Sequence, residues 1–274
     1  MKKIHRAAVI WYSQTEHTAI YGRLIAEVFS AEGIECLAED YRNINQESLR
    51  DIELLVIGTP VFYGDIPVNM RQWLLSLPSL MGIPAAAYVT CGGKGGGYYS
   101  TDCNVLALLR KKGAIPLDMA AFHNMSTFTP TWSWGGRKLT LAYGDLPNEK
   151  TYESVRSFAK VLLGEAETDP IPVLAMEAVP IGAIARVAQH LIKFMITKHR
   201  IDKSSCSECG ICEQKCPVQV IDCHEKTVMT KRCIACFGCV NTCPTGALQM
   251  NFLGKSLLGF TRFREKYNVL LKKP

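Results

Sequence analysis

A cysteine pattern that occurs twice constrains this chain more than any other feature of its sequence. The pattern C-x2-C-x2-C-x3-C-P begins at Cys206 and returns at Cys233, so the segment is an internal duplication. Nine of the twelve cysteines lie between Cys206 and Cys243. Their concentration in one segment, in a chain expected to stay in a reducing compartment, argues against a disulfide framework. The pattern predicts a small metal or cluster module attached to an ordinary domain.

The remaining composition is typical of a folded globular protein. Of the 274 residues, 48% are hydrophobic and 20% are charged, which excludes wholesale disorder. No run of 18 apolar residues exists, so no segment is predicted to span a bilayer. The apolar run Ala7–Trp11 is too short for the core of a signal peptide. These features favour a cytoplasmic location.

The spacing of the cysteines favours iron–sulfur clusters over zinc or structural thiols. Three cysteines two residues apart can wrap three corners of a cubane, and the fourth, before the proline, reaches the other cluster. Zinc sites instead prefer two C-x2-C pairs with a long spacer, or include His. We therefore predict two [4Fe–4S] clusters. The expected ligands are Cys206, Cys209, Cys212 and Cys243 for the first cluster, and Cys233, Cys236, Cys239 and Cys216 for the second.

Residues 201–250 resemble the bacterial dicluster ferredoxins. The resemblance includes Pro217, Pro244 and the Thr245-Gly246-Ala247 that follows the second run. It implies a small α+β domain that holds two [4Fe–4S] clusters. Cys223 lies outside both runs, and we expect it to be a buried spare thiol.

The first 165 residues alternate between strand and helix patterns. The expected strands are 7–12, 34–41, 54–58, 85–90 and 114–122, and the expected helices are 15–31, 68–77, 102–112 and 149–163. Five strands alternating with helices predict an α/β fold with a doubly wound, five-stranded parallel sheet. Ligands of such sheets bind at the carboxyl ends of the strands.

Three loops lie at that edge of the predicted sheet. The loop after the first strand leads into a helix, so its amides and hydroxyls could cradle a phosphate; an ordinary N-cap is the alternative. The loop after the third strand holds two aromatic residues, and the loop after the fourth holds five glycines that permit close approach of a ligand. Neither a G-x-G-x-x-G motif nor a P-loop is present.

Together these loops resemble the FMN site of flavodoxin-like proteins, over residues 4–164. The resemblance implies that the first loop holds the FMN phosphate and that the other two flank the ring, with no catalytic residue assigned. The implied cofactor-binding residues are Ser13, Gln14, Thr15, His17, Thr18, Thr59, Pro60, Val61, Phe62, Tyr63, Gly64, Cys91, Gly92, Gly93 and Gly97. Glu16 stands where the family pattern T-x-T-G-x-T has Gly. An acid there must face solvent to be tolerated beside a phosphate, and we expect His17 to offset part of its charge.

Four parts are predicted along the chain: a flavodoxin-like domain (1–165), a linker with an amphipathic helix (166–200), a ferredoxin domain (201–250) and a basic tail (251–274). The apolar stripe of the helix predicted from Ile181 to Arg200 is expected to pack between the domains. Residues 171–200 carry 4 basic and 1 acidic residues (net +3), and the tail carries 6 and 1 (net +5). Contact of 181–200 and 251–274 with an acidic partner or a membrane surface is the alternative. The long segment 124–148, with Trp132 and Trp134, is expected to be a lid, a contact to the cluster domain or a local core.

These parts predict an electron-transfer protein that relays electrons between its clusters and FMN. An FMN-dependent reductase of a small molecule, fed by its own ferredoxin domain, is the alternative, and a redox-sensing protein is a third. We expect redox proteins as partners, with donor and acceptor unspecified, and no nucleic acid.

Overall fold

The computed structural model describes residues 3–93, 98–176 and 187–274. Gly97 and the first part of the helix predicted from Ile181 lie outside these residues. Within them, no helix combines the length and the apolarity needed to cross a bilayer.

The N-terminal part is built on a parallel sheet of five strands in the order β2-β1-β3-β4-β5. The strands are β1 (Arg6–Trp11), β2 (Glu35–Asp40), β3 (Leu54–Pro60), β4 (Pro84–Gly92) and β5 (Ile115–Asn124). This strand order is that of the flavodoxin-like doubly wound fold, so the predicted fold class is confirmed.

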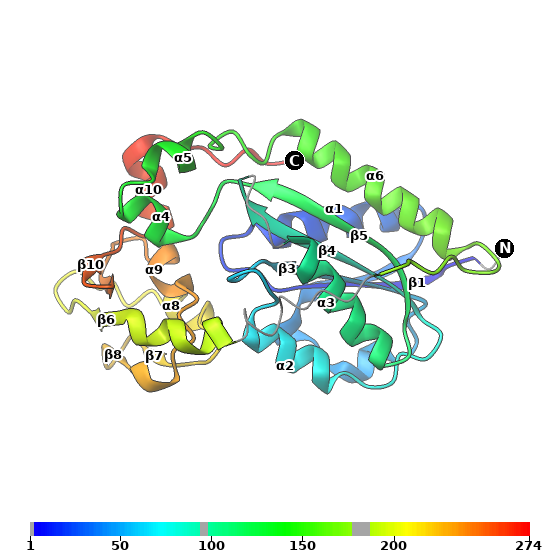
Figure 1. The fold of residues 1–274 in the computed structure, drawn as a ribbon, viewed down its shortest axis with the longest axis horizontal. Helices are drawn as coiled ribbons and strands as arrows, with labels where there is room; N and C mark the ends of the chain where they lie inside the picture. Colours follow the sequence, from blue (N-terminus) through cyan, green and yellow to red (C-terminus); the bar gives the residue numbers. More distant parts are fainter. Residues whose placement is uncertain (1–2, 94–97, 177–186) are drawn as a thin grey trace.

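Helices cover both faces of the sheet (Figure 1), which is why its inner strands β1, β3 and β4 are buried on both sides. Val9 and Trp11 of β1 pack in the same core as α1 (His17–Ala31) and α6 (Glu149–Ala166). Ala8 and Ile10 point to the other face, where α2 (Val68–Ser76) and α3 (Tyr98–Lys111) form a second core. The alternation along β1 therefore places one residue in each core in turn.

The cysteine-rich part lies beyond the carboxyl ends of the parallel strands (Figure 1). Its sheet has the order β10-β9-β6, with β6 (Ile196–Ile201) antiparallel to β9 (Leu248–Phe252) and β9 antiparallel to β10 (Lys255–Ser256). A hairpin joins β7 (Ile221–Asp222) to β8 (Thr227–Val228). A short helix accompanies each cysteine run, α8 (Ile211–Gln214) in the first and α9 (Gly238–Thr242) in the second. The short 3-10 turns of the chain are η1 (Tyr41–Asn43), η2 (Gln46–Leu49), η3 (Ile192–Met195) and η4 (Thr230–Arg232).

The helix predicted to end at Arg200 is wrong in its second half. Residues 187–191 are helical, but η3 follows and 196–201 form strand β6. In the described residues most of the apolar stripe is not covered, because Val187 is 59% and Leu191 is 54% exposed, whereas Ile192 packs against the core of the cysteine-rich part. The buried residue of this helix is polar: Gln189 donates hydrogen bonds from Nε2 to the carbonyl oxygens of Phe62 (2.9 Å) and Ile66 (3.1 Å).

The tail and the 124–148 segment pack on each other. Trp132, in α4 (Thr129–Ser133), shares a small core with Phe260 and Phe263 of α10 (Phe260–Tyr267), and its Nε1 donates to the carbonyl oxygen of Leu258 at 2.7 Å. After α4, the segment continues through α5 (Arg137–Leu141), while Trp134 stacks on Phe252 of β9. The segment therefore forms both a local core and a contact to the cysteine-rich part.

Candidate functional site

A pocket of about 260 Å³ lies where the parallel sheet meets the cysteine-rich part. Nine of its lining residues come from the three predicted loops: Gln14, Thr15, His17, Thr18, Pro60, Val61, Phe62, Tyr63 and Gly92. The others are Thr90, Asn124, Ser126, Thr127, Phe128, Ala235, Cys236 and Phe237. The structure thus brings the three loops together at one site, as the fold requires.

The first loop ends in a residue with left-handed backbone geometry. Glu16 is the N-cap of α1 with φ 71°, a conformation that favours Gly, and its side chain caps none of the helix amides. The backbone at this position therefore adopts the glycine-like geometry although the residue is an acid. Thr18 and Thr90 both line the pocket, with their hydroxyls 2.8 Å apart.

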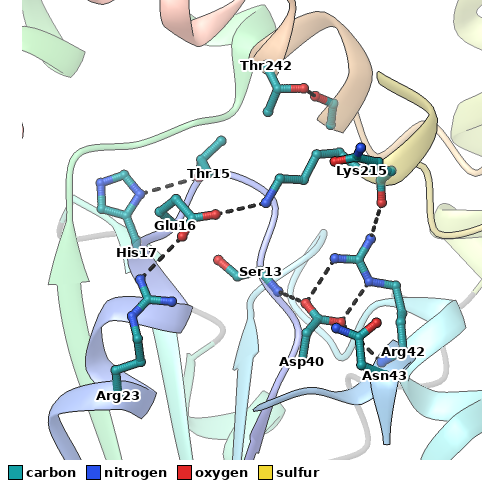
Figure 2. A network of polar contacts seen from close by, with 12 residues as sticks. Ser13, Thr15, Glu16, His17, Arg23, Asp40, Arg42, Asn43, Lys215 and Thr242 are labelled. Carbon is teal, nitrogen blue, oxygen red and sulfur yellow. Dashed lines mark hydrogen bonds and ion pairs between the residues drawn. The ribbon is translucent and has the colours of Figure 1, made fainter. Parts of the chain in front are cut away.

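The Glu16 side chain does not line the pocket and belongs to a network of charged groups (Figure 2). Its carboxylate pairs with Arg23 (3.3 Å) and with Lys215 of the cysteine-rich part (2.8 Å). Burial raises the pKa of Glu16, but the hydrogen bonds and charges of Lys215 and Arg23 outweigh it, so the pKa lies below its ordinary value. The acid is therefore ionised and neutralised by two cations. The Glu16 side chain is 48% exposed, which agrees with the expectation that an acid at this position faces solvent.

His17 differs from its predicted role. The side chain is buried, and burial lowers its pKa to about 4, so the ring is neutral at pH 7 and does not offset the charge of Glu16. Lys215 and Arg23 take that role instead. The buried Nε2 of His17 and Oδ1 of Asn124 have no hydrogen-bond partner within the described part of the chain. Both residues line the pocket, which is the situation expected where a polar ligand completes a site.

Among the described residues, five of the predicted ones do not line the pocket. These are Ser13, Thr59, Gly64, Cys91 and Gly93. The amide of Ser13 donates to Asp40 at 3.4 Å. The Cys91 thiol lies 3.4 Å from His123 Nδ1, and burial raises its pKa to about 12.

The loop after the fourth strand, β4, packs closely against the segment that follows β5. A Cβ on Gly92 would lie 2.5 Å from Ser126 Cα, so glycine at this position allows the 124–128 backbone to approach and form a wall of the pocket. Sequence reasoning missed Asn124, Ser126, Thr127 and Phe128 as site residues, although the length of the 124–148 segment was a signal for them. Nothing in the sequence pointed to Ala235 and Phe237.

The eight motif cysteines surround two separate cavities. One is lined by Cys206, Cys209, Cys212 and Cys243, and the other by Cys216, Cys233, Cys236 and Cys239. Each cavity thus combines three cysteines of one run with the fourth of the other. In the described residues, no group of three His, Cys, Asp or Glu side chains is placed so that it could hold a single metal ion. Cys223 is buried (1% exposed), as expected, and also lines the first cavity.

The second cysteine cavity touches the pocket. Cys236 and Phe237 line both. The hydroxyl of Tyr63 donates to the carbonyl oxygen of Ala235 at 3.0 Å. A Cβ on Gly238 would lie 2.8 Å from Gln14 Nε2, so the start of α9 packs directly on the first loop. Burial raises the pKa of Cys236 to about 12, so the thiol is protonated at pH 7 in the absence of a metal, and a metal bound there would have to displace that proton.

Comparison with known families identifies part of the cysteine-rich region. Residues 199–222 match the 4Fe-4S binding domain family. The match includes the first cysteine run and not the second. An uncharacterized protein of Methanocaldococcus jannaschii is 35% identical over 77 residues, which are 28% of this chain and 29% of that protein.

Solved structures similar to this chain include flavodoxins. A flavodoxin from the domain Archaea is 12% identical and matches 60% of this chain and 99% of its own, with a TM-score of 0.45. Flavodoxin 1 from Bacillus cereus is 16% identical and matches 58% of this chain and 97% of its own, with a TM-score of 0.46. Rubredoxin oxygen:oxidoreductase from Desulfovibrio gigas is 15% identical and matches 61% of this chain and 37% of its own, with a TM-score of 0.42. The fold itself is established by the strand order. The chain therefore joins a flavodoxin-like domain to a 4Fe–4S binding domain.

Proposed function

We propose that this chain is an electron-transfer protein that binds FMN in the pocket and two [4Fe–4S] clusters in the cysteine cavities. The observation that carries the proposal is the position of Cys236. This expected ligand of the second cluster lines the same pocket as the flavin loops. A flavin can hold one or two electrons and a cluster one, so their contact suits exchange between one-electron and two-electron partners.

The residues of the first loop fit the phosphate end of FMN. The uncapped start of α1 offers backbone amides, and the hydroxyls of Thr15 and Thr18 lie beside it. The orphaned Nε2 of His17 lies in the same wall. Phe62, Tyr63 and Phe128 supply flat apolar surface for the ring.

The cysteines fit two clusters placed in series. The second cavity shares Cys236 and Phe237 with the pocket, whereas the first shares no lining residue with it. Among the ligands expected for the first cluster, Cys209 is exposed. We infer that the second cluster is the immediate neighbour of the flavin and the first lies farther along the path.

Contacts between the domains fix this arrangement. They include the Tyr63–Ala235 hydrogen bond, the Glu16–Lys215 ion pair and the hydrogen bond from Arg42 Nη1 to the carbonyl oxygen of Gln214 at 2.9 Å. A fused chain held in this way keeps the distance between the cofactors constant and removes the need for a separate carrier.

The proposal is tested by anaerobic purification with iron, sulfide and flavin measured per chain. We expect about eight irons, about eight sulfides and one FMN. Reduction of the clusters should then reduce the flavin at a rate independent of protein concentration. Two zinc ions without acid-labile sulfide, or a rate proportional to protein concentration, would refute the relay. Rapid turnover of a quinone would point to the reductase instead.

A further inference from the structure

A second hollow of about 530 Å³ lies on the outer side of the second cysteine cavity. It is lined by residues of η3, β6 and η4, among them Lys193, Lys198 and Lys231. Cys233, an expected ligand of the second cluster, also lines it. The proposed flavin site reaches this cluster at Cys236, and the hollow reaches it at a different cysteine.

Within the described residues, the surface around the hollow carries cationic side chains that no acid pairs with. The sequence contains no Asp or Glu in 187–201 or in 226–264. Lys193, Lys198, Lys231 and Arg232 make no ion pair with any residue that the structure describes. Lys226, by contrast, pairs with Glu208 at 2.9 Å. The four unpaired cations thus produce a field that attracts an acidic surface.

Apolar side chains are exposed on the same face. Phe194, which lines the hollow, is 74% exposed, and Met229 beside Thr230 is 55% exposed. Leu253 is also exposed, and its amide donates to the carbonyl oxygen of Met195 at 2.7 Å, so it lies next to the end of η3. Aromatic and Met side chains are enriched at protein interfaces.

We propose that this surface docks a small acidic protein that carries one electron, and that the electron passes between that carrier and the second cluster at Cys233. The proposal rests on the proposed function, because it requires the second cluster. One electron leaves the iron–sulfur centre of the reduced carrier and enters the centre that Cys233 helps to hold, so no bond changes and no proton moves. The position of Cys233 in the hollow favours a redox protein over an anionic membrane, because a redox protein exchanges electrons with a cluster and a lipid surface does not.

Charge reversal in the reconstituted full-length protein tests the proposal. The triple variant K193E/K198E/K231E changes the formal net charge from +6 to 0. The matched control K111E/K150E/K160E makes the same change on helices α3 and α6. The probe is a reduced acidic plant-type ferredoxin, and the measurement is the second-order rate of cluster reduction in a stopped-flow instrument at low ionic strength.

We expect the hollow variant to be reduced at least tenfold more slowly than the wild type, and the control within about twofold. The wild-type rate should fall as salt is added, and that of the hollow variant should fall much less. Dithionite should reduce all three proteins fully, which shows that the clusters are intact. If the Glu variant does not fold, the neutral variant K193Q/K198Q/K231Q should give a smaller decrease in the same direction.

Equal rates for the hollow variant and the control would overturn the proposal. So would binding to phosphatidylserine vesicles that depends on the three lysines, with no effect of these lysines on the ferredoxin rate. A failure of the proposed function has another signature: the ferredoxin would reduce the clusters with the expected charge dependence, but no electron would reach the flavin.

Discussion

Lys215 reaches from the end of α8 to Glu16 in the first loop, where its Nζ lies 2.8 Å from Glu16 Oε1 (Figure 2). Lys215 directly precedes Cys216, the expected fourth ligand of the second cluster. Glu16 directly precedes α1, whose first turn is the proposed phosphate site. One ion pair therefore connects the proposed binding sites of the two cofactors.

Lys215→Ala should weaken FMN binding, because it leaves the Glu16 carboxylate with one cation fewer beside the phosphate. Glu16 is 48% and Lys215 is 27% exposed, so solvent limits the effect to about 1 kcal/mol, or about fivefold in Kd. The measurement is titration of the apo-flavin protein by quenching of FMN fluorescence. Adding Glu16→Gln to Lys215→Ala should restore most of the affinity.

Lys226→Ala is the matched control, because Lys226 also pairs with a glutamate but lies wholly within the cysteine-rich part. It should leave the Kd for FMN unchanged. An equal loss in both lysine variants would mean that the small domain acts through its general stability and not through Glu16.

The sheet was predictable from sequence because its signal is local. Strands β1, β3 and β4 each carry an apolar run that both helical layers bury, as the buried residues Leu54–Thr59 of β3 show. The grouping of the eight cysteines around two cavities was likewise predictable from the spacing of the two runs. The left-handed backbone geometry of Glu16 was harder to predict from the sequence. Gly, Asn and Asp are the residues that indicate a positive φ, and Glu is not one of them.

The second half of the predicted helix failed for a different reason. Residues 196–201 pair with β9, about fifty residues later in the chain, and no local pattern specifies such a partner. His199 and Ile201 are buried while Arg200 is exposed, which is strand alternation, but six residues are too few to outweigh the preceding helical period. An apolar stripe also does not reveal whether anything covers it, as the exposed Leu191 shows.

Thr15→Ala combined with Thr18→Ala should lower FMN affinity at least tenfold. Each hydroxyl is expected to donate to a charged phosphate, and such hydrogen bonds contribute about 1.5–3 kcal/mol. Ser154→Ala, on the exposed part of α6, is a control of the same kind and should not alter binding. Unchanged affinity in the double variant would place the phosphate elsewhere.

Cys216→Ala should damage the second cluster and spare the first, although Cys216 belongs to the first run. The reason is that Cys216 lines the cavity of Cys233, Cys236 and Cys239. Electron paramagnetic resonance of the reduced protein distinguishes the clusters, with Cys243→Ala as the reciprocal variant. Loss of the same signal in both variants would contradict the crossed ligand sets.

Cys91 should be nearly inert toward alkylation in the folded protein. Burial raises its pKa to about 12, so at pH 8 its thiolate is about a thousandfold scarcer than in the unfolded chain. Because the thiolate is lost below the pKa, the rate should still be rising between pH 8 and pH 10. The rate of Cys91 alkylation is measured by mass spectrometry after iodoacetamide treatment, with urea-unfolded protein as the reference. A folded-state rate close to the unfolded one would show that the site opens.

Transfer between the clusters and the flavin should depend on Gln189 and not on its neighbour Leu191. The buried amide of Gln189 holds the segment before β6 to the carbonyl oxygens of Phe62 and Ile66, on either side of Tyr63. Gln189→Ala removes both hydrogen bonds. The Phe62 carbonyl still accepts from the amide of Asp65 at 3.0 Å, but the Ile66 carbonyl loses the donor described here, at a cost of about 1–3 kcal/mol. We expect the first-order rate of flavin reduction after rapid cluster reduction to fall, with both cofactors still at full occupancy.

Leu191→Asp is the matched variant on the same helix. Its side chain is 54% exposed, so a charge there is solvated and the transfer rate should stay at the wild-type value. The pair of variants therefore separates two means of holding the domains in register, a buried polar anchor and an apolar stripe. A slower rate in Leu191→Asp, with Gln189→Ala unaffected, would show that the apolar stripe is covered during transfer. The helix would then have to occupy a different position at that moment.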